Sequence, residues 1–314
     1  MPSPELPEGV STWCAVELGS APIEVLHISE QMSSVLGLRL EDGREVAVKT
    51  RPDDPAGRAA ACVEVQRVAG RAGQPVAMPL TPARRVTGPA GEALVRHAEQ
   101  WRGGGDMMRD DRPEAARRSA AGLAALMEVL TSCDPEPGIV SPPWVDWAHG
   151  GPGVFPPIPF LDQRDQDAVP TVLMEAARRV KELLAKSSLP HVVGHADFEA
   201  QNLRWNGDQL WCVHDFDSIG TAPEAAFVGA AAGAFCSQET PTLAPVASSS
   251  AFIEAYQRTR GRAFTAHETQ VAWAAGLWPA VWNARAEALF DHPPITTEPL
   301  LAQLDERLHN AGLA

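Results

Sequence analysis

The most constraining feature of the chain is the segment from residue 191 to 217, which contains the sequence HVVGHADFEAQNLRWNGDQLWCVHDFD. Carboxylates and histidines gather here between apolar runs that are typical of strands, although acidic side chains repel one another and are costly near a core. His195, Asp197 and Asn202 follow the spacing H-x-D-x-x-x-x-N. The runs NLRW and LWCVH, with NGDQ between them, predict a hairpin that returns the chain, so we expect Asn202 and Asp215 to lie close together.

The residue types at these positions indicate a magnesium site beside a proton acceptor. The amide oxygen of Asn202 and the carboxylate of Asp215 are hard donors that suit Mg²⁺. Asp197 stands at the start of the loop, outside the expected metal shell, where it can accept a proton from an attacking hydroxyl group. A kinase catalytic loop and its metal-binding aspartate have this layout, with H-R-D-x-x-x-x-N and D-F-G where this chain has H-A-D-F-E-A-Q-N and D-F-D.

Two further residues stand upstream in the order that a kinase requires. The sequence VAVK at 46–49 places Lys49 at the end of a predicted strand, after the hairpin turn EDG. Glu64 lies inside the predicted helix that comes next, where a glutamate would hold the lysine in an ion pair. Each residue alone fits an ordinary surface position, but their order and spacing together are far more specific.

Hydrophobic patterning divides the chain into a strand-rich part and a helical part. Short β-branched runs predict strands at 12–18, 23–28, 34–40, 44–50 and 91–99, and residues 53–73 predict one helix among them. Later segments predict helices near 112–131, 166–187, 223–236, 247–260, 266–290 and 297–311. We therefore expect an α+β fold with a small β-rich N-terminal lobe at 1–98 and a larger, mainly helical C-terminal lobe at 99–314.

With these motifs the chain resembles the aminoglycoside phosphotransferase and choline kinase family of small-molecule kinases, over roughly residues 20 to 290. The resemblance implies a bilobal kinase-like fold and Mg²⁺-dependent phosphorylation of a small-molecule hydroxyl group by ATP, or by GTP. It also implies roles for the matching residues: Asp197 as the catalytic residue, Asn202 and Asp215 as Mg²⁺ ligands, Asp217 as a weaker metal position, Lys49 as a phosphate ligand paired with Glu64, and His195 as the brace of the loop.

The resemblance further implies how the nucleotide is bound. Backbone groups of the segment 94–98, with Val95 and His97 in it, are expected to contact the base. The loop SEQMSS at 29–34 departs from the family pattern because it contains no glycine, and glycine lets backbone N–H groups approach phosphate closely. Hydroxyl groups of Ser33 and Ser34 are the expected substitutes. This departure keeps open an alternative function, a kinase-like protein that binds a ligand without turnover.

Other enzyme classes fit the sequence less well. A protein kinase needs a long activation segment between the metal aspartate and A-P-E, whereas APE at 222–224 follows shortly after Asp215. No G-x-x-x-x-G-K-[ST] motif occurs, which excludes a P-loop kinase. A hydrolase metal cluster of His195, Asp197, His214 and Asp215 remains a weaker alternative, because neighbours on a strand point to opposite faces.

Charge and composition limit the classes of molecule that the protein is expected to bind. The formal net charge of −14 disfavours nucleic acid and an anionic membrane surface as partners. It favours a cationic or polyhydroxylated acceptor. Such an acceptor includes an antibiotic, which the enzyme would inactivate to give resistance. Five scattered cysteines without a C-x-x-C pair predict reduced thiols in a cytoplasmic protein, and no apolar run is long enough for a membrane helix. The oligomeric state cannot be derived from the sequence.

Three tryptophans are candidates for the acceptor pocket. Trp278 and Trp282 are four residues apart on the predicted helix 266–290 and so lie on one face of it. Trp147 belongs to the Pro- and Gly-rich loop 141–159, and loops gain little by exposing an indole ring. Core packing is the simpler alternative for the two helical tryptophans.

Overall fold

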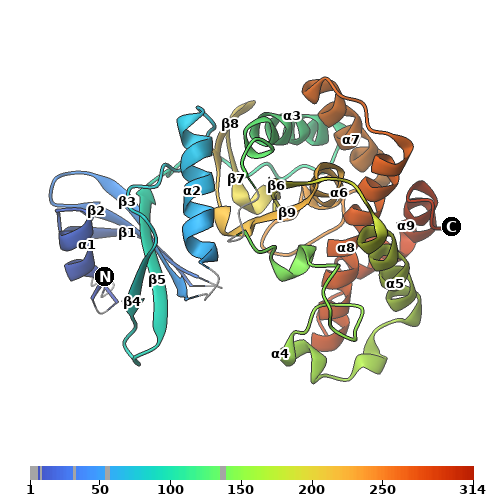
Figure 1. Cartoon of the computed structure of the whole chain (residues 1–314), viewed down its shortest axis with the longest axis horizontal. Helices are drawn as coiled ribbons and strands as arrows, with labels where there is room; N and C mark the ends of the chain where they lie inside the picture. Colours follow the sequence, from blue (N-terminus) through green and yellow to red (C-terminus); the bar gives the residue numbers. More distant parts are fainter. Residues whose placement is uncertain (1–5, 8, 31–32, 54–56, 135–138) are drawn as a thin grey trace. The chain divides into compact units, whose positions relative to one another are not determined.

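The computed structural model describes residues 6–7, 9–30, 33–53, 57–134 and 139–314, and its chain forms two compact units (Figure 1). The first unit contains the described residues up to Gly104, together with 139–140 and Cys212–Asp217. The rest of the described chain forms the second unit. The division falls after Gly104, whereas the sequence suggested a boundary at residue 98 and no later return of the chain to the first lobe.

A five-stranded antiparallel sheet forms the centre of the first unit. Its strands are β1 (Pro22–Glu30), β2 (Ser34–Leu40), β3 (Glu45–Pro52), β4 (Arg84–Thr87) and β5 (Ala93–Gln100), in the spatial order β1-β2-β3-β5-β4. The register places Lys49 of β3 opposite His97 of β5, and Ala47 opposite Glu99. Because side chains alternate across a strand, these four residues share one face of the sheet.

The two faces of this sheet differ in chemistry. Figure 1 shows helix α1 (Val10–Glu17) on one face and helix α2 (Arg58–Arg71) on the other. The face under α1 is an apolar core, whose members include Trp13 from the helix and Leu38, Val46, Val48 and Ala98 from the strands. The face under α2 buries polar side chains instead, among them Lys49, Gln66 and Glu99. The face under α2 therefore carries the chemistry of this unit.

Helix α1 corrects one expectation from the sequence, which assigned residues 12–18 to a strand. Val10, Trp13 and Cys14 are buried against the sheet. Their spacing of three and four residues is that of a helix face, and a strand would have alternated between the core and solvent. A second omission is β4, a short edge strand that the sequence did not predict. The first unit thus has two helices in its described residues, where one was expected.

Helices make up most of the second unit, and they coincide with the helices expected from the sequence. They are α3 (Pro113–Leu130), α5 (Thr171–Lys186), α6 (Glu224–Ala234), α7 (Val246–Arg260), α8 (Ala266–Phe290) and α9 (Thr297–Asn310). Short helical turns lie between them: η1 (Pro143–Val145), α4 (Pro159–Asp162), η2 (Gln166–Ala168), η3 (Ala200–Asn202) and η4 (Phe216–Ser218). Among the described residues, no helix has the length and apolar character needed to cross a membrane.

Two short antiparallel strand pairs position the motif segment. Strand β6 (His191–His195) pairs with β9 (Ile219–Pro223), and β7 (Leu203–Asn206) forms a two-stranded sheet with β8 (Gln209–Val213). The turn of this second pair contains Gly207 with φ of 58°, a left-handed conformation that glycine adopts without strain. The hairpin predicted from NGDQ is therefore present.

Helices α6 and α8 pack with their backbones in contact because glycines lie between them. A Cβ atom added at Gly229 of α6 would lie 1.8 Å from the carbonyl oxygen of Ala272 in α8. One added at Gly276 of α8 would lie 2.8 Å from the carbonyl oxygen of Gly229. Small residues let helix backbones approach this closely. Since α6 follows directly on β9, which pairs with β6, this packing supports the strand that leads into the motif loop.

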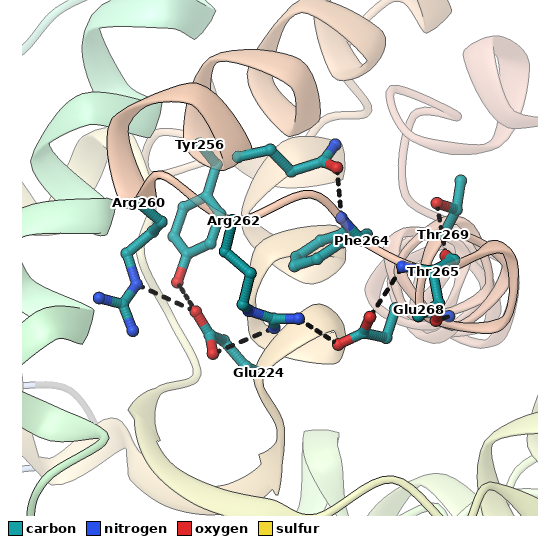
Figure 2. Close-up of polar contacts among 9 residues, drawn as sticks. Glu224, Tyr256, Arg260, Arg262, Phe264, Thr265, Glu268 and Thr269 are labelled. Carbon is teal, nitrogen blue, oxygen red and sulfur yellow. Dashed lines mark hydrogen bonds and ion pairs between the residues drawn. The ribbon is translucent and has the colours of Figure 1, made fainter.

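Glu224, the first residue of α6, connects that helix to α7 and α8 (Figure 2). Its Oε1 accepts hydrogen bonds from the Tyr256 hydroxyl group at 2.6 Å and from Arg260 Nε at 3.1 Å. Its Oε2 lies 3.3 Å from Arg262, whose other nitrogen donates to Glu268 at 2.7 Å. Burial opposes ionisation of Glu224, but these donors outweigh it and lower the pKa of its carboxyl group. The glutamate of the APE sequence therefore has a structural role.

Candidate active site

The motif loop that follows β6 brings its two most important side chains together. The side-chain nitrogen of Asn202 donates to Asp197 Oδ2 at 2.7 Å and to the Asp197 backbone carbonyl oxygen at 2.9 Å. Both residues are half-buried. A carboxylate that accepts a short hydrogen bond from an amide is held in one orientation. The spacing of five residues along the loop thus produces the contact between the predicted base and a predicted metal ligand.

His195 supports this loop from beneath. It is the last residue of β6 and is fully buried, and its Nδ1 accepts the backbone N–H of Asp197 at 3.2 Å. Its ring lies edge-on to the ring of Phe198, with the ring centroids 6.2 Å apart. The backbone N–H of Ala196 donates to the carbonyl oxygen of Ser218, which continues the strand pairing into the loop. The histidine therefore acts as a brace of the loop, in the place that the sequence suggested.

Glu199 is a buried carboxyl group that sequence reasoning missed. Only 9% of Glu199 is exposed, and Gln201 Nε2 donates to its Oε2 at 3.1 Å. Burial raises the pKa of Glu199 well above its usual range, and the negative charge of Asp197 raises it further. Asp208, in the turn after β7, has by contrast a side chain that is 87% exposed and pairs with Arg118. The motif loop thus contains a buried carboxyl group, Glu199, whose surroundings favour its neutral form.

Asp215 belongs to the first unit, in the segment Cys212–Asp217. It follows β8 after the single residue His214 and has φ of 57°, in the left-handed region that residues other than glycine seldom adopt. Holding such a conformation costs about 1–3 kcal/mol and is most common where a side chain must be aimed for function. The negative charge of Asp215 helps to raise the pKa of Lys49 in the same unit. The predicted metal carboxylate and the predicted phosphate ligand therefore act on each other electrostatically.

Lys49 has a carboxylate partner, but on a strand and not on the helix. Its Nζ lies 3.0 Å from Glu99 Oε1, and both side chains are almost completely buried. Burial opposes the charged lysine, but Glu99 and Asp215 outweigh it, so the pKa of Lys49 is raised. Burial also opposes the charged glutamate, yet Lys49 and then His97 hold the pKa of Glu99 well below its usual range. The pair is therefore fully ionised at neutral pH.

The expected ion pair between Lys49 and Glu64 is wrong. Glu64 lies on the exposed side of α2, where it pairs with Arg67 one turn later. The side chain of α2 that contacts Glu99 is Gln66, which is only 3% exposed. Because residues two apart on a helix point to different sides, Gln66 and Glu64 cannot both face Lys49. The signal that could have found Glu99 is the alternation of His97 and Glu99 in HAEQ, on the strand that pairs with β3.

The strand position of Val95 and His97 does not favour the base-binding role expected of them. Within the sheet, Val95 pairs with Arg51 on one side and Arg85 on the other. His97 pairs with Lys49 and has a buried side chain, 2% exposed, whose pKa is lowered by that burial. Backbone groups committed to a sheet ladder are not available to a ligand. A role of this segment in holding the base thus gains no support from its placement.

Asp217 is engaged by basic residues of the first unit. Its carboxylate forms an ion pair with Arg51 of β3, and Arg58 of α2 donates to its backbone carbonyl oxygen. A carboxylate committed to a guanidinium group is a poorer metal ligand than one without such a partner. The contacts therefore favour a structural role for Asp217, tying the end of the motif segment to β3 and α2, over the weak metal role suggested by the sequence.

The serines of the loop between β1 and β2 are described in part. Ser34 begins β2, is half-buried, and pairs with Glu30 of β1 and Thr50 of β3. Ser33 is half-buried just before it. Residues 31–32 of the loop lie outside the described part of the chain. Whether these hydroxyl groups contact phosphate stays a prediction.

The tryptophans proposed for the acceptor pocket pack into the second unit. Phe155, from the loop 141–159, lies 5.3 Å from Trp278 and 5.6 Å from Trp282 of α8 by ring centroids. Trp278 is fully buried, Trp282 is half-buried and Trp147 is 4% exposed. Arg285 stacks over Phe155 at 5.0 Å. The loop is thus anchored on α8 by aromatic contacts, and Trp282 keeps the most exposure of the three candidate tryptophans.

Solved structures show the same fold at low sequence identity. The amicoumacin kinase hAmiN, solved with AMP-PNP, Ca²⁺ and Ami, is 11% identical with a TM-score of 0.64, and the match covers 92% of this chain and 88% of that one. The spectinomycin phosphotransferase APH(9)-Ia, solved with ADP and spectinomycin, is 12% identical with a TM-score of 0.55, over 98% and 100% of the two chains. An aminoglycoside phosphotransferase from Alicyclobacillus acidocaldarius is 14% identical with a TM-score of 0.54, over 99% and 96%.

These structural matches confirm the kinase-like α+β fold expected from the sequence. No curated protein matches the chain. The model of the phosphotransferase enzyme family, APH, matches residues 28–264, a region that contains Lys49, Glu99, the motif loop and Asp215. The chain therefore belongs to the phosphotransferase enzyme family and is a small-molecule phosphotransferase.

Proposed function

We propose that this phosphotransferase transfers the γ-phosphoryl group of ATP, or of GTP, to a hydroxyl group of a small molecule. The observation that carries the proposal is the contact between Asn202 and Asp197 Oδ2 at 2.7 Å. It supports a carboxylate held at the start of the loop, beside an amide whose oxygen can bind a metal. The family membership supports the reaction class, and the buried, charged Lys49 supports a phosphate ligand.

Asp197 is the residue that would position and deprotonate the acceptor. The acceptor oxygen attacks the γ-phosphorus, its proton passes to the Asp197 carboxylate, and the bond from the γ-phosphorus to the bridging oxygen of the nucleoside diphosphate breaks. Asn202 holds the carboxylate in place by its hydrogen bond, and the backbone of Asp197 is held by His195. Catalysis by positioning needs such fixed geometry, because a small misplacement of the base costs much of the rate.

The donor set fits Mg²⁺. The side-chain nitrogen of Asn202 is committed to Asp197, which leaves its amide oxygen for a ligand, and Asp215 is the carboxylate that the sequence predicts as the second ligand. Both are the hard oxygen donors that Mg²⁺ prefers. When bound, the ion would neutralise negative charge on the phosphate oxygens. Across the described residues, no three His, Cys, Asp or Glu side chains form a group that could hold a metal.

Lys49 would bind the phosphates of the nucleotide. Its ammonium group has three N–H donors, and Glu99 is the one partner within salt-bridge distance among the described residues. The raised pKa of Lys49 keeps the positive charge at all ordinary pH values. A positive charge held in a water-poor site interacts more strongly with phosphate than one at the surface.

The acceptor is expected to be a cationic or polyhydroxylated small molecule. The net charge of −14 favours a positively charged ligand over a negatively charged one. Two of the related structures are named for enzymes of the antibiotics amicoumacin and spectinomycin, which makes antibiotics the first class to test. Resistance by phosphorylation of an antibiotic is the function that this chemistry would serve.

Replacing the base tests the reaction. Asp197→Asn should reduce turnover by about 10²–10⁴-fold while the Kd of Mg-ATP changes by less than about threefold, because the base acts on the acceptor. Asp208→Asn is the matched control, since Asp208 is exposed at the tip of the β7–β8 hairpin that follows the motif loop. Near-normal turnover of Asp197→Asn would show the assignment to be wrong.

A screen of acceptors tests the substrate class and the alternative without turnover. Thermal shift of the protein with Mg-ATP and a panel of antibiotics, amines, sugars and nucleosides should reveal a stabilising acceptor, and release of ADP should follow with that compound. Absence of nucleotide binding by calorimetry at high concentration would favour the kinase-like binding protein, for which the glycine-free loop at 29–34 is the argument.

A further inference from the structure

We propose that Glu99, a residue of strand β5 next to β3, is the positioning residue that holds Lys49 ready for the nucleotide phosphates. This inference rests on the proposed function, because it assumes that Lys49 binds those phosphates. It assigns to a strand carboxylate the task that a kinase usually gives to a glutamate on the helix after β3.

The register of the sheet places the two residues for this contact. Lys49 is opposite His97 and Ala47 is opposite Glu99, so Glu99 is the diagonal neighbour of Lys49 on the same face. Diagonal neighbours on adjacent strands are within reach when one side chain is long. The observed separation of 3.0 Å between Lys49 Nζ and Glu99 Oε1 is that of a hydrogen-bonded ion pair. The contact is therefore built into the pairing of β3 with β5.

The second oxygen of Glu99 has its own partner. Gln66 Nε2 donates to Glu99 Oε2 at 2.7 Å and to the backbone carbonyl oxygen of Ala77 at 2.7 Å. Gln66 is 3% exposed and Glu99 is 2% exposed. Each carboxylate oxygen is thus occupied by a different donor, which fixes the carboxylate plane. Helix α2 contributes an amide to this arrangement, and its own glutamate, Glu64, is exposed and pairs with Arg67.

The charges of the surrounding residues agree with a positioning role. Glu99 stays ionised because Lys49 and His97 favour its carboxylate form more than burial disfavours it. His97 lies on the same face with its Nε2 at 3.8 Å from Glu99 Oε2. A buried carboxylate whose positive partner is removed is strongly destabilised, so the pair is retained as a unit. Lys49 still has further N–H donors with which it can bind phosphate.

The first experiment compares Glu99→Gln with Glu64→Gln, which is a matched change on α2. Glu99→Gln should raise the Kd of Mg-ATP and its KM by about tenfold, because one partner of a buried ion pair has been removed. The same measurements on Glu64→Gln should differ from wild type by less than about twofold, as for most exposed ion pairs. The idea is overturned if Glu64→Gln produces the larger loss, or if folded Glu99→Gln binds Mg-ATP as wild type does.

A double-mutant cycle with Lys49→Met separates positioning from general structural support. If Glu99 acts through Lys49, then adding Glu99→Gln to Lys49→Met should change the Kd of Mg-ATP by less than about twofold. An equal loss in both backgrounds would mean that Glu99 only supports the fold, and the inference would be wrong. Lys49→Met alone tests the underlying function: if it leaves nucleotide affinity unchanged, the proposed role of Lys49 fails, whatever Glu99 does.

Circular dichroism and thermal unfolding establish that each variant is folded. Should Glu99→Gln fail to fold, Glu99→Asp takes its place in the same cycle, because it keeps the charge and withdraws the carboxylate from Lys49. Its loss of nucleotide affinity should appear in the wild-type background and disappear in the Lys49→Met background. A loss of equal size in both backgrounds would again contradict the inference.

Discussion

The side-chain amide of Asn202 donates to Asp197 Oδ2 at 2.7 Å, so its nitrogen orients the predicted base while its oxygen remains a predicted ligand of the metal. The amide nitrogen and the amide oxygen of a single side chain diverge from one carbon, so they can contact two different groups. Asn202 can therefore link the acceptor half of the reaction to the nucleotide half. A change at this position is expected to affect both halves at once.

Asn202→Ala should lower kcat by about 10- to 100-fold, because it removes a hydrogen bond to a charged group that contributes about 1.5–3 kcal/mol. It should also raise the Mg²⁺ concentration needed for half-maximal activity, since a ligand oxygen is lost. Initial rates measured over a series of Mg²⁺ concentrations check both effects. An unchanged Mg²⁺ requirement would argue that Asn202 does not bind the metal.

Gly229→Ala should destabilise the protein by more than about 3 kcal/mol, because the added Cβ atom would lie 1.8 Å from the carbonyl oxygen of Ala272 and α6 would have to move away from α8. Chemical unfolding in urea measures the change. Gly150→Ala is the matched control, since a Cβ atom there meets nothing within 4 Å, and it should change the free energy of unfolding by less than about 0.5 kcal/mol. Equal stability of the two variants would contradict the close packing of α6 on α8.

Glu224→Gln should destabilise the second unit by about 1–3 kcal/mol at pH 7, because the carboxylate accepts hydrogen bonds from Tyr256, Arg260 and Arg262. The folded-state pKa of Glu224 is lowered, so its contribution is present above the unfolded-state pKa and is lost as pH falls through the folded-state pKa. The difference between wild type and variant should therefore shrink below about pH 4. A difference in unfolding free energy that is constant from pH 7 to pH 3 would exclude an ionic contribution.

The cysteines should differ in reactivity in the folded protein. Cys14, Cys212 and Cys236 are buried, and burial raises the pKa of their thiols to about 11, about 11 and about 12. Cys133 is partly exposed. Because the thiolate is the reactive form, iodoacetamide should modify Cys133 first, as read by mass spectrometry of peptides. Cys133→Ser should abolish the fast phase of modification, and rapid modification of Cys236 would contradict its burial.

The contact between Asp197 and Asn202 could be predicted from the sequence because it is local. A loop of fixed length between a strand and a hairpin leaves few conformations, and the Asn-Gly turn identifies the hairpin. The helices of the second unit were also predictable, since their apolar spacing extends over several turns. Contacts between residues close in sequence and long periodic patterns are therefore the features that a single sequence predicts best.

The partner of Lys49 could not be predicted in the same way. Glu64 stands at a suitable distance along the chain, but whether a helix residue faces a sheet depends on the rotation of the helix about its axis. In α2 the apolar residues Val65 and Ala69 turn Gln66 inward and leave Glu64 exposed. Glu99 becomes the partner only through the register of β3 with β5, which a single sequence does not specify.

Burial of polar residues was equally hard to foresee. Glutamate is a residue type that usually lies at the surface, and the burial of Glu199 beside Asp197 depends on how the loop folds. The segment 12–18 has the β-branched and aromatic residues of a strand, yet it forms α1 because Val10, Trp13 and Cys14 share a helical face. In both cases packing in three dimensions outweighed the local preference.

The ion pair of Lys49 with Glu99 also has a consequence for how a movement of helix α2 would affect the site. In protein kinases the equivalent lysine is paired with a glutamate on a mobile helix, and displacing that helix switches the enzyme off. Here the lysine and the glutamate sit on neighbouring strands of one sheet, and α2 contributes only the amide of Gln66. Displacing α2 would break a hydrogen bond but leave the ion pair intact. Movement of α2 is therefore not a means of separating Lys49 from its carboxylate in this protein.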